Sequence, residues 1–266
     1  MRKTKIICTI GPASQNKQTL TAMCQAGMNV ARLNFSHGTY PEQQEKIDLI
    51  KQVRQELGLP IAIMLDTKGP EYRIRTFRDG KITLNEGDTF TFTADEVEGD
   101  QTRVSVNYKK LAENLSVGDH VLVNNGLVVC QVTEIRGGDV VTRVLVGGEL
   151  SNRKSMSFPN KVMSGPYLSE QDKQDLLFGI QNQVDFVAAS FVSTKSDMEQ
   201  LKNFLVENGG EDIELIAKIE NRAGVDNVEE ICQIADGVMI ARGDLGVEIP
   251  FVEVPAIQKR LTSTCR

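Results

Sequence analysis

The chain has 266 residues, of which 40% are apolar and 25% charged, a composition that excludes an intrinsically disordered protein. Its formal net charge is −6 with both signs interspersed, so no basic stripe is present and we expect no nucleic acid partner. The five cysteines are odd in number and contain no C-x-x-C pair, which predicts reduced thiols in a cytoplasmic protein.

Residues 1–70 are predicted to form the first part of a parallel α/β sheet. Three apolar runs are typical of buried strands, and the segments between them have helical patterns. The expected strands are 4–10, 28–34 and 61–66, and the expected helices are 16–26 and 42–57. The first apolar run ends at Gly11 and Pro12, too soon for a signal peptide or a membrane span, so we expect no membrane association.

Residues 71–161 have a different pattern. Short alternating segments such as DTFTFT and VVTRVLV are separated by EGD, NNG and GG, which are hairpin signals. This stretch is therefore predicted to be an all-β domain inserted after the third strand.

Residues 162–266 return to the first pattern. The expected helices are 169–182, 195–208, 224–235 and 254–264, and the expected strands are 184–192, 213–220 and 237–243. Together the two flanking parts supply about six strand–helix units, whereas a closed eight-fold barrel takes roughly 250 residues. The predicted fold is an α/β (β/α)8-type barrel that is incomplete, with about six strands. We therefore expect the chain to be the N-terminal part of a longer protein.

Four of the predicted strands end in polar residues. The segments are MNVARLNFSHG at 28–38, LDTKGPE at 65–71, IAKIEN at 216–221 and GVMIARGDLG at 237–246. Because the carboxyl ends of parallel barrel strands meet at one face, these side chains are expected to lie close together and to form a site.

Two carboxylates and a lysine stand out in this set. Glu220 and Asp244 end neighbouring strands, and paired carboxylates suit a hard cation such as Mg²⁺. Lys218 lies two positions before Glu220, so strand alternation sends both side chains to the same side. The alternative for an arbitrary pair is two solvated loop ends and a lysine that extends from a strand end into water.

Seven segments carry a resemblance to the pyruvate kinase family. They are TKIICTIGP, MNVARLNFSHG, LDTKGPE, SEQDKQDL, VDFVAASFV, AKIENRAGVDN and ARGDLGVEIP, in this order and with a β insert after the third. The resemblance implies a barrel A domain, an inserted B domain over 71–161 that acts as a lid, and a C-terminal domain that has no counterpart here. It also implies a phosphotransferase that moves the phosphoryl group of phosphoenolpyruvate to ADP, giving pyruvate and ATP in glycolysis.

The resemblance assigns roles to particular residues. Lys218 and Arg32 would be catalytic and would bind substrate together with Gly243 and Asp244. Mg²⁺ would be held by Glu220 and Asp244, and K⁺ by Asn34, Ser36, Asp66 and Thr67. The ADP or ATP phosphates would meet His37, Arg73 and Lys154. A turn role remains the alternative for Asn34, Ser36 and His37, and a two-residue shift would give the role of Arg73 to Arg75.

Several expectations concern the chain taken alone. The later barrel motifs of the family, including a Thr-Ala-Thr strand end, have no counterpart in the sequence, so the 266 residues alone are expected to be weakly active or inactive. The alternative is a non-catalytic fragment that binds phosphoenolpyruvate or assembles with another subunit. A lyase-type barrel is a third and weaker hypothesis. The full-length family implies a homo-oligomer, and the state of this chain stays open.

Overall fold

The computed structural model describes residues 3–265, and its first unit is a curled parallel sheet with strand order β1-β2-β3-β13-β14-β15. The strands are β1 (Ile7–Thr9), β2 (Val30–Asn34), β3 (Ala62–Asp66), β13 (Phe186–Ala189), β14 (Glu214–Ile219) and β15 (Gly237–Ile240). All neighbours pair in parallel, and β2 and β3 are in register so that Asn34 lies opposite Asp66. The predicted incomplete barrel of about six strands is confirmed.

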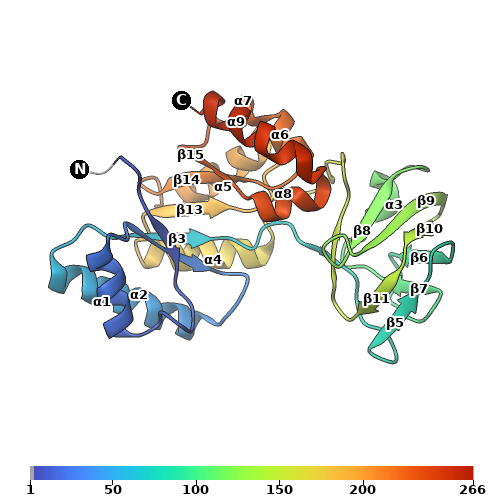
Figure 1. Ribbon diagram of the computed structural model, residues 1–266, viewed down its shortest axis with the longest axis horizontal. Coiled ribbons are helices and arrows are strands. Elements are labelled where there is room, and N and C mark those ends of the chain that lie inside the picture. Colours follow the sequence, from blue (N-terminus) through green and yellow to red (C-terminus); the bar gives the residue numbers. More distant parts are fainter. Residues whose placement is uncertain (1–2, 266) are drawn as a thin grey trace.

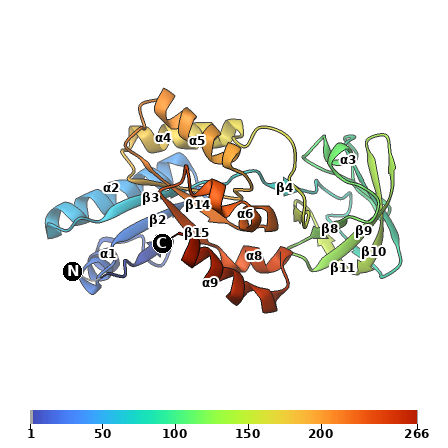
Figure 2. The same cartoon turned by 90° about the horizontal axis from the view of Figure 1, so that it is seen from above.

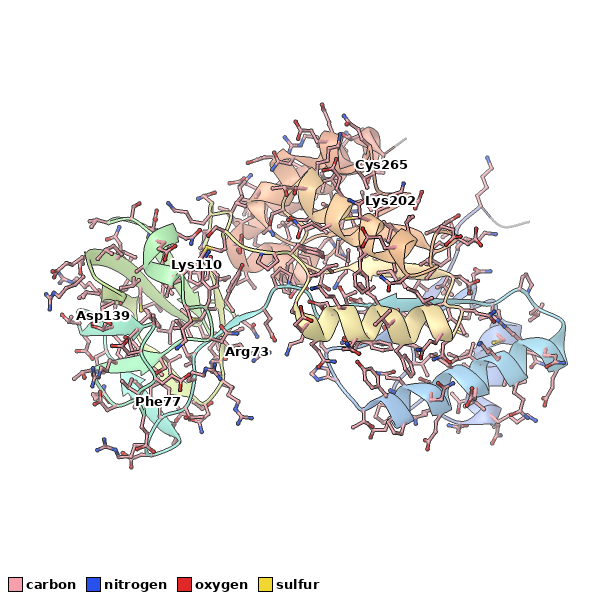
Figure 3. All side chains as sticks on the ribbon, turned by 180° about the vertical axis from the view of Figure 1, so that it is seen from behind. Arg73, Phe77, Lys110, Asp139, Lys202 and Cys265 are labelled. Carbon is pink, nitrogen blue, oxygen red and sulfur yellow. The ribbon has the colours of Figure 1, made fainter. Side chains whose placement is uncertain are left out.

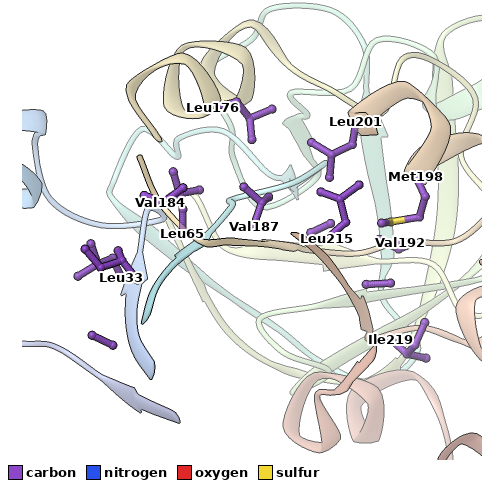
Figure 4. Packing of buried hydrophobic residues seen from close by; sticks show 14 of the residues in the cluster. Leu33, Leu65, Leu176, Val184, Val187, Val192, Met198, Leu201, Leu215 and Ile219 are labelled. Carbon is purple, nitrogen blue, oxygen red and sulfur yellow. The ribbon is translucent and has the colours of Figure 1, made fainter. Parts of the chain in front are cut away.

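Helices cover the outer face of this sheet (Figures 1 and 2). They are α1 (Lys17–Ala26), α2 (Tyr40–Leu57), α4 (Glu170–Gln181), α5 (Lys195–Glu207), α6 (Arg222–Asp226), α7 (Val228–Ile231), α8 (Arg242–Glu248), the 3-10 helix η1 (Phe251–Glu253) and α9 (Val254–Thr264). The main core lies between sheet and helices, where Leu65, Leu176 and Leu201 are buried (Figure 4). A smaller cluster of Val30, Met64 and Ala188 is also buried.

Between β3 and α4 the chain forms a β unit of its own. Its larger sheet has the order β4-β12-β8-β9-β10-β6-β7, and β11 pairs with β5. The elements are β4 (Tyr72–Arg73), β5 (Lys81–Leu84), β6 (Thr89–Thr93), β7 (Arg103–Ser105), α3 (Leu111–Asn114), β8 (His120–Val123), β9 (Val128–Arg136), β10 (Asp139–Val146), β11 (Gly148–Ser151) and β12 (Ser155–Ser157). Figure 1 shows this unit beside the end of β3 to which the strand arrow points, joined to the parallel sheet by two connecting segments. The domain limits at 71 and 161 stay a prediction.

The local structure differs from the prediction in two places. The helix expected over 224–235 is broken into α6 and α7 at Asn227, whose side-chain amide donates to the carbonyl of Ser193 at 2.8 Å. Residues 242–248 form α8, so the strand expected over 237–243 ends earlier, at Ile240, and Gly243 and Asp244 lie at the helix start that the resemblance implies. In the described part of the chain, no helix combines the length and the hydropathy needed to cross a bilayer.

The segment that leaves β3 is held against the end of β13. Gly69 has φ +69°, its N–H donates to Asp172 Oδ1 at 3.0 Å, and a Cβ atom there would lie 2.7 Å from the carbonyl oxygen of Ser190. Only glycine fits this approach without displacing backbone. The linker to the β unit therefore starts from a fixed position.

Candidate functional site

A buried lysine lies at the carboxyl ends of the parallel strands, as the motif pattern predicted. Lys218 is 7% exposed, and its Nζ lies 3.0 Å from Asp66 Oδ1 and 3.1 Å from Glu220 Oε1. It also donates to Ser190 Oγ at 2.7 Å. A buried ammonium is stable only when it is paired and hydrogen-bonded. These three contacts supply that pairing.

Asp66 joins this lysine to a second cation. Its Oδ2 accepts a hydrogen bond from Arg32 Nε at 2.5 Å, while Oδ1 accepts from Lys218 and from Ser190. A terminal nitrogen of Arg32 donates to Thr9 Oγ1 at 2.7 Å. Positive and negative side chains therefore alternate along this cluster, in the order Arg32, Asp66, Lys218 and Glu220.

Glu220 is held by backbone as well as by Lys218. Its Oε2 accepts the N–H of Phe191 at 2.6 Å, and Phe191 has φ +56°, a left-handed conformation that is rare for a bulky residue. Burial raises the pKa of Glu220, with the charge of Asp244 acting in the same direction and that of Lys218 opposing it.

Asp244 is the free carboxylate of this site. It lies in the first turn of α8, its side chain is exposed, and within residues 3–265 it makes no hydrogen bond or ion pair. Its effect on the pKa of Glu220 shows that the two carboxylates are electrostatic neighbours. Two hard oxygen donors of this kind fit Mg²⁺, which usually takes one or two carboxylates and completes its shell with water and phosphate oxygens. The described residues contain no group of three or more His, Cys, Asp or Glu side chains that could hold a metal ion.

A cleft of about 750 Å³ opens between the strand ends and the β unit. Glu220 and Asp244 line it from the sheet side, and Arg73 and Lys154 line it from the side of the insert. Arg73 lies at the junction between the two units in Figure 3. The arrangement places two carboxylates opposite two cations across one space.

Some predicted residues lie outside this cleft. Arg32, Asn34, Ser36, His37, Asp66, Thr67, Lys218 and Gly243 are not among the residues that line it. His37 is exposed on the loop before α2, where its backbone carbonyl accepts from Gln43 at 2.8 Å. Gly243 is exposed at the start of α8, with no atom within 4 Å of a Cβ built there.

The guanidinium group of Arg73 already has partners within the protein. It pairs with Glu71 and donates to the carbonyl of Arg153 at 2.5 Å. Burial would raise the pKa of Glu71, but the hydrogen bond and charge of Arg73, together with Lys68, lower the pKa below its ordinary value. A phosphate that enters the cleft would therefore compete with Glu71 for Arg73.

The oxygens expected to hold K⁺ gather at the ends of β2 and β3. Asn34 Oδ1 accepts the N–H of Ser36 at 3.0 Å, and Thr67 Oγ1 accepts that of Ser190 at 3.1 Å. Asp66 is shared by Arg32 and Lys218, as described. These are hard donors, which suit an alkali cation. The potassium site stays a prediction.

Ser190 is a residue that the sequence reasoning missed. Its hydroxyl accepts from Lys218 and donates to the carbonyl of Thr67 at 2.6 Å, so it joins the lysine to the linker. The signal was weak, because Ser190 lies inside the predicted strand VDFVAASFV, two positions before its apolar end, whereas the strand itself already ends at Ala189. Serine after a strand is a common turn residue, which hid this role.

Comparison with known proteins shows which family the chain belongs to. The family model described as pyruvate kinase, barrel domain, matches residues 1–266. This chain belongs to the pyruvate kinase family.

Its relatives include bacterial pyruvate kinases. It is 46% identical over 266 residues to the enzyme of Clostridium perfringens, covering 100% of this chain and 56% of that one. It is 47% identical over 267 residues to that of Bacillus licheniformis, covering 100% and 46%. The crystal structure of a pyruvate kinase from Cryptosporidium parvum superposes with a TM-score of 0.95 at 37% identity, covering 99% of this chain and 55% of the other. The chain thus spans about half the length of the curated relatives it matches.

Proposed function

We propose that this chain carries the phosphoenolpyruvate site of a pyruvate kinase, which transfers a phosphoryl group to ADP and yields pyruvate and ATP in glycolysis. The observation that carries the proposal is the convergence of Lys218 and Glu220 at the strand ends, with Asp244 beside them at the cleft. Family membership supports the reaction class.

Lys218 would stabilise charge on the transferring group. The oxygens of a phosphoryl group in transit carry delocalised negative charge, and a positioned ammonium stabilises it without reorganisation. Asp66, Glu220 and Ser190 fix the position of Nζ. Loss of such a group typically lowers the rate by ~10² to 10³.

Arg32 would bind the phosphate of phosphoenolpyruvate. Asp66 engages its Nε and Thr9 one terminal nitrogen, which leaves N–H donors of the planar fork for an anion. Gly243 and Asp244 would meet the substrate at the first turn of α8. On the opposite wall, Arg73 and Lys154 would meet the ADP phosphates with His37, and the β unit would exclude water as it closes.

Two cations complete the proposal. Glu220 and Asp244 would hold Mg²⁺, which when bound supplies positive charge next to the phosphate and the enolate oxygen. Asn34, Ser36, Asp66 and Thr67 would hold K⁺. The expected location is the cytoplasm.

For the 266 residues alone we propose metal-dependent binding with little turnover. In the described sheet, β1 and β15 each pair on one side only, so the barrel is open at that point. This observation favours the alternative of a binding or assembly fragment over a fast enzyme.

The test combines calorimetric titration of phosphoenolpyruvate with ³¹P NMR detection of ATP, each with and without Mg²⁺. We expect binding that requires Mg²⁺. Asp244→Asn should weaken it by at least about tenfold, since even outer-shell partners of metal ligands change affinity by about 10- to 100-fold. Asp244 is chosen because its side chain is exposed and the fold does not depend on it. Glu229→Gln, an exposed carboxylate on α7, is the matched control and should leave binding unchanged.

Three outcomes are distinguishable. Metal-dependent binding without ATP supports the site and the fragment alternative. ATP formed at rates on the order of 10 per second supports the enzyme and contradicts the expectation of low turnover. The absence of any metal-dependent binding in a folded chain overturns the proposed site.

A further inference from the structure

We propose that Cys232 and Cys265 form a reversible disulfide that joins α7 to α9. Their sulfur atoms lie 3.8 Å apart, although the residues are 33 positions apart in sequence. Neither residue lines the cleft. The pair is therefore a modification site that is separate from the proposed phosphoryl-transfer chemistry.

The fold brings the two thiols together at two helix ends. Cys232 is the C-cap of α7 and Cys265 the C-cap of α9. The two helices pack against each other, and Ile231 and Leu261, each next to this contact, are fully buried. Arg260 also donates to the carbonyl of Val225, which fixes α9 to α6. A disulfide bond of about 2.05 Å needs the sulfurs to approach further, which side-chain rotation can supply.

Cys8 and Cys24 are also electrostatic neighbours, because the charge of Cys8 contributes to the raised pKa of Cys24. Cys24 and Cys130 are buried, and Cys8 is half-buried. Among residues 3–265, the Cys232–Cys265 contact is the one recorded between two sulfurs. Cys265 is exposed and Cys232 half-buried, so a reagent in solution reaches Cys265 first. Figure 3 places Cys265 on the helical part of the molecule, away from Arg73 at the junction.

A low-molecular-weight disulfide such as glutathione disulfide is the oxidant class. The Cys265 thiolate attacks one sulfur of that disulfide, forms a mixed disulfide and releases one glutathione thiolate. The Cys232 thiolate then attacks the Cys265 sulfur and releases the second. Two electrons pass from the cysteines to glutathione disulfide, and the two cysteine protons end on two molecules of glutathione.

The reaction should accelerate with pH. Burial and the neighbouring Cys265 raise the pKa of Cys232 to about 11, so few molecules hold the attacking thiolate at neutral pH. The site therefore responds to sustained oxidising conditions and not to brief ones.

The disulfide would close a loop that contains β15, α8 and Asp244. Cross-linking of this kind removes conformational freedom from the unfolded chain, and the effect grows with loop length. The last strand and helices of the sheet should therefore become more resistant to unfolding when the two thiols are oxidised.

The experiment incubates the chain with glutathione disulfide at mildly alkaline pH and then counts free thiols under denaturing conditions. We expect the count to fall from five to three, with a non-reduced peptide that links 232 to 265. The melting temperature of the parallel-sheet part should rise by roughly 5 to 10 °C and return on reduction. Cys265→Ser should abolish both effects, whereas the control Cys8→Ser/Cys24→Ser should retain them.

Two results overturn the proposal. One is a stable glutathione adduct on Cys265 while Cys232 stays free. The other is a disulfide that joins two chains instead of two helices of one chain, seen as a doubled mass without reductant.

Discussion

Charge alternation explains how four ionisable side chains share the strand ends. Arg32 and Lys218 carry positive charge, Asp66 and Glu220 negative charge, and each neighbouring pair is within salt-bridge distance. The formal charges cancel, so the low-dielectric interior tolerates them. Removing Lys218 would leave Glu220 buried without a cationic partner and Asp66 paired with Arg32 alone, and breaking a buried pair typically costs about 3–5 kcal/mol. Functional tests are therefore cleaner at Asp244 than at Lys218.

Glu248, on α8 at the cleft, predicts a pH dependence of stability. Burial raises its pKa to about 7, above the 4.5 of an unperturbed glutamate. The folded state therefore binds more protons than the unfolded state between these values, and stability is lost as pH rises through about 7. The Glu248→Gln variant lacks this titratable group and should not lose stability in this way. The difference in free energy of unfolding, variant minus native chain, should therefore increase by about 2 kcal/mol between about pH 5 and about pH 8.

Urea unfolding at several pH values would measure this effect. Glu229→Gln, on the surface of α7, serves as the control and should track the native chain at every pH. A Glu248→Gln variant that is equally stable relative to the native chain at both ends of the range would contradict the assignment.

At the scale of elements, the hydrophobic pattern identified the strands and most helices. It did not identify the break between α6 and α7 or the boundary between β15 and α8. The boundaries of the helices predicted over 195–208 and 254–264 agree with those of α5 and α9 to within two residues. The helix over 224–235 was wrong as one piece because Asn227 binds the Ser193 carbonyl, a contact between distant segments. Likewise the strand expected over 237–243 is shorter, because β15 ends at Ile240 and α8 begins at Arg242.

The site shows the same limit. Pattern located Glu220 and Asp66 because each lies at a strand end, and Lys218 because strand alternation puts it on the same side as Glu220. It could not find Ser190 or the left-handed Phe191, whose roles depend on hydrogen bonds across three strands. Nor could it show that Asp66 is shared by two cations.

Two helical glycines should respond oppositely to the same substitution. A Cβ on Gly224 in α6 would lie 2.5 Å from the backbone oxygen of Val192, which cannot move freely. Gly224→Ala should therefore destabilise the chain by about 1–3 kcal/mol, despite the better helix propensity of alanine. At Gly246 in α8 the nearest atom is Phe251 Cδ2 at 3.9 Å, so Gly246→Ala should be neutral or stabilising by up to about 1 kcal/mol.

Thermal or urea unfolding of the two alanine variants provides the measurement. Equal stability of the pair would show that the approach of α6 to the Val192 carbonyl is looser than described.

At the scale of the whole molecule, each of the two units has a large hydrophobic core of its own among the described residues. One lies between the parallel sheet and its helices, and the other lies inside the β unit around Phe90 and Phe92. Two segments connect the units (Figures 1 and 2). The sequence pattern changes near 71 and 161, because alternation and helical periodicity are local, and the domain limits placed there stay a prediction. The width of the cleft cannot be predicted from local sequence pattern, since it depends on how the two units pack against each other.

Separate cores predict separate unfolding transitions. Phe90 is fully buried and packs edge-on against Phe92 at 5.4 Å between ring centroids. Phe90→Ala should destabilise the β unit by about 3–5 kcal/mol and lower one calorimetric transition. The transition of the parallel sheet should move little, because its core shares no residue with that of the β unit.

Ile47→Ala in α2 is the reciprocal variant, since Ile47 is fully buried in the other core. It should lower the transition that Phe90→Ala leaves in place, by about 2–5 kcal/mol of its unfolding free energy. If both variants shift a single common transition equally, the units unfold as one, and the cleft contacts stabilise the molecule more than either core does alone. Two independent shifts would instead establish that the β unit can move over the cleft without unfolding the sheet that holds Lys218, which closure over a bound nucleotide requires.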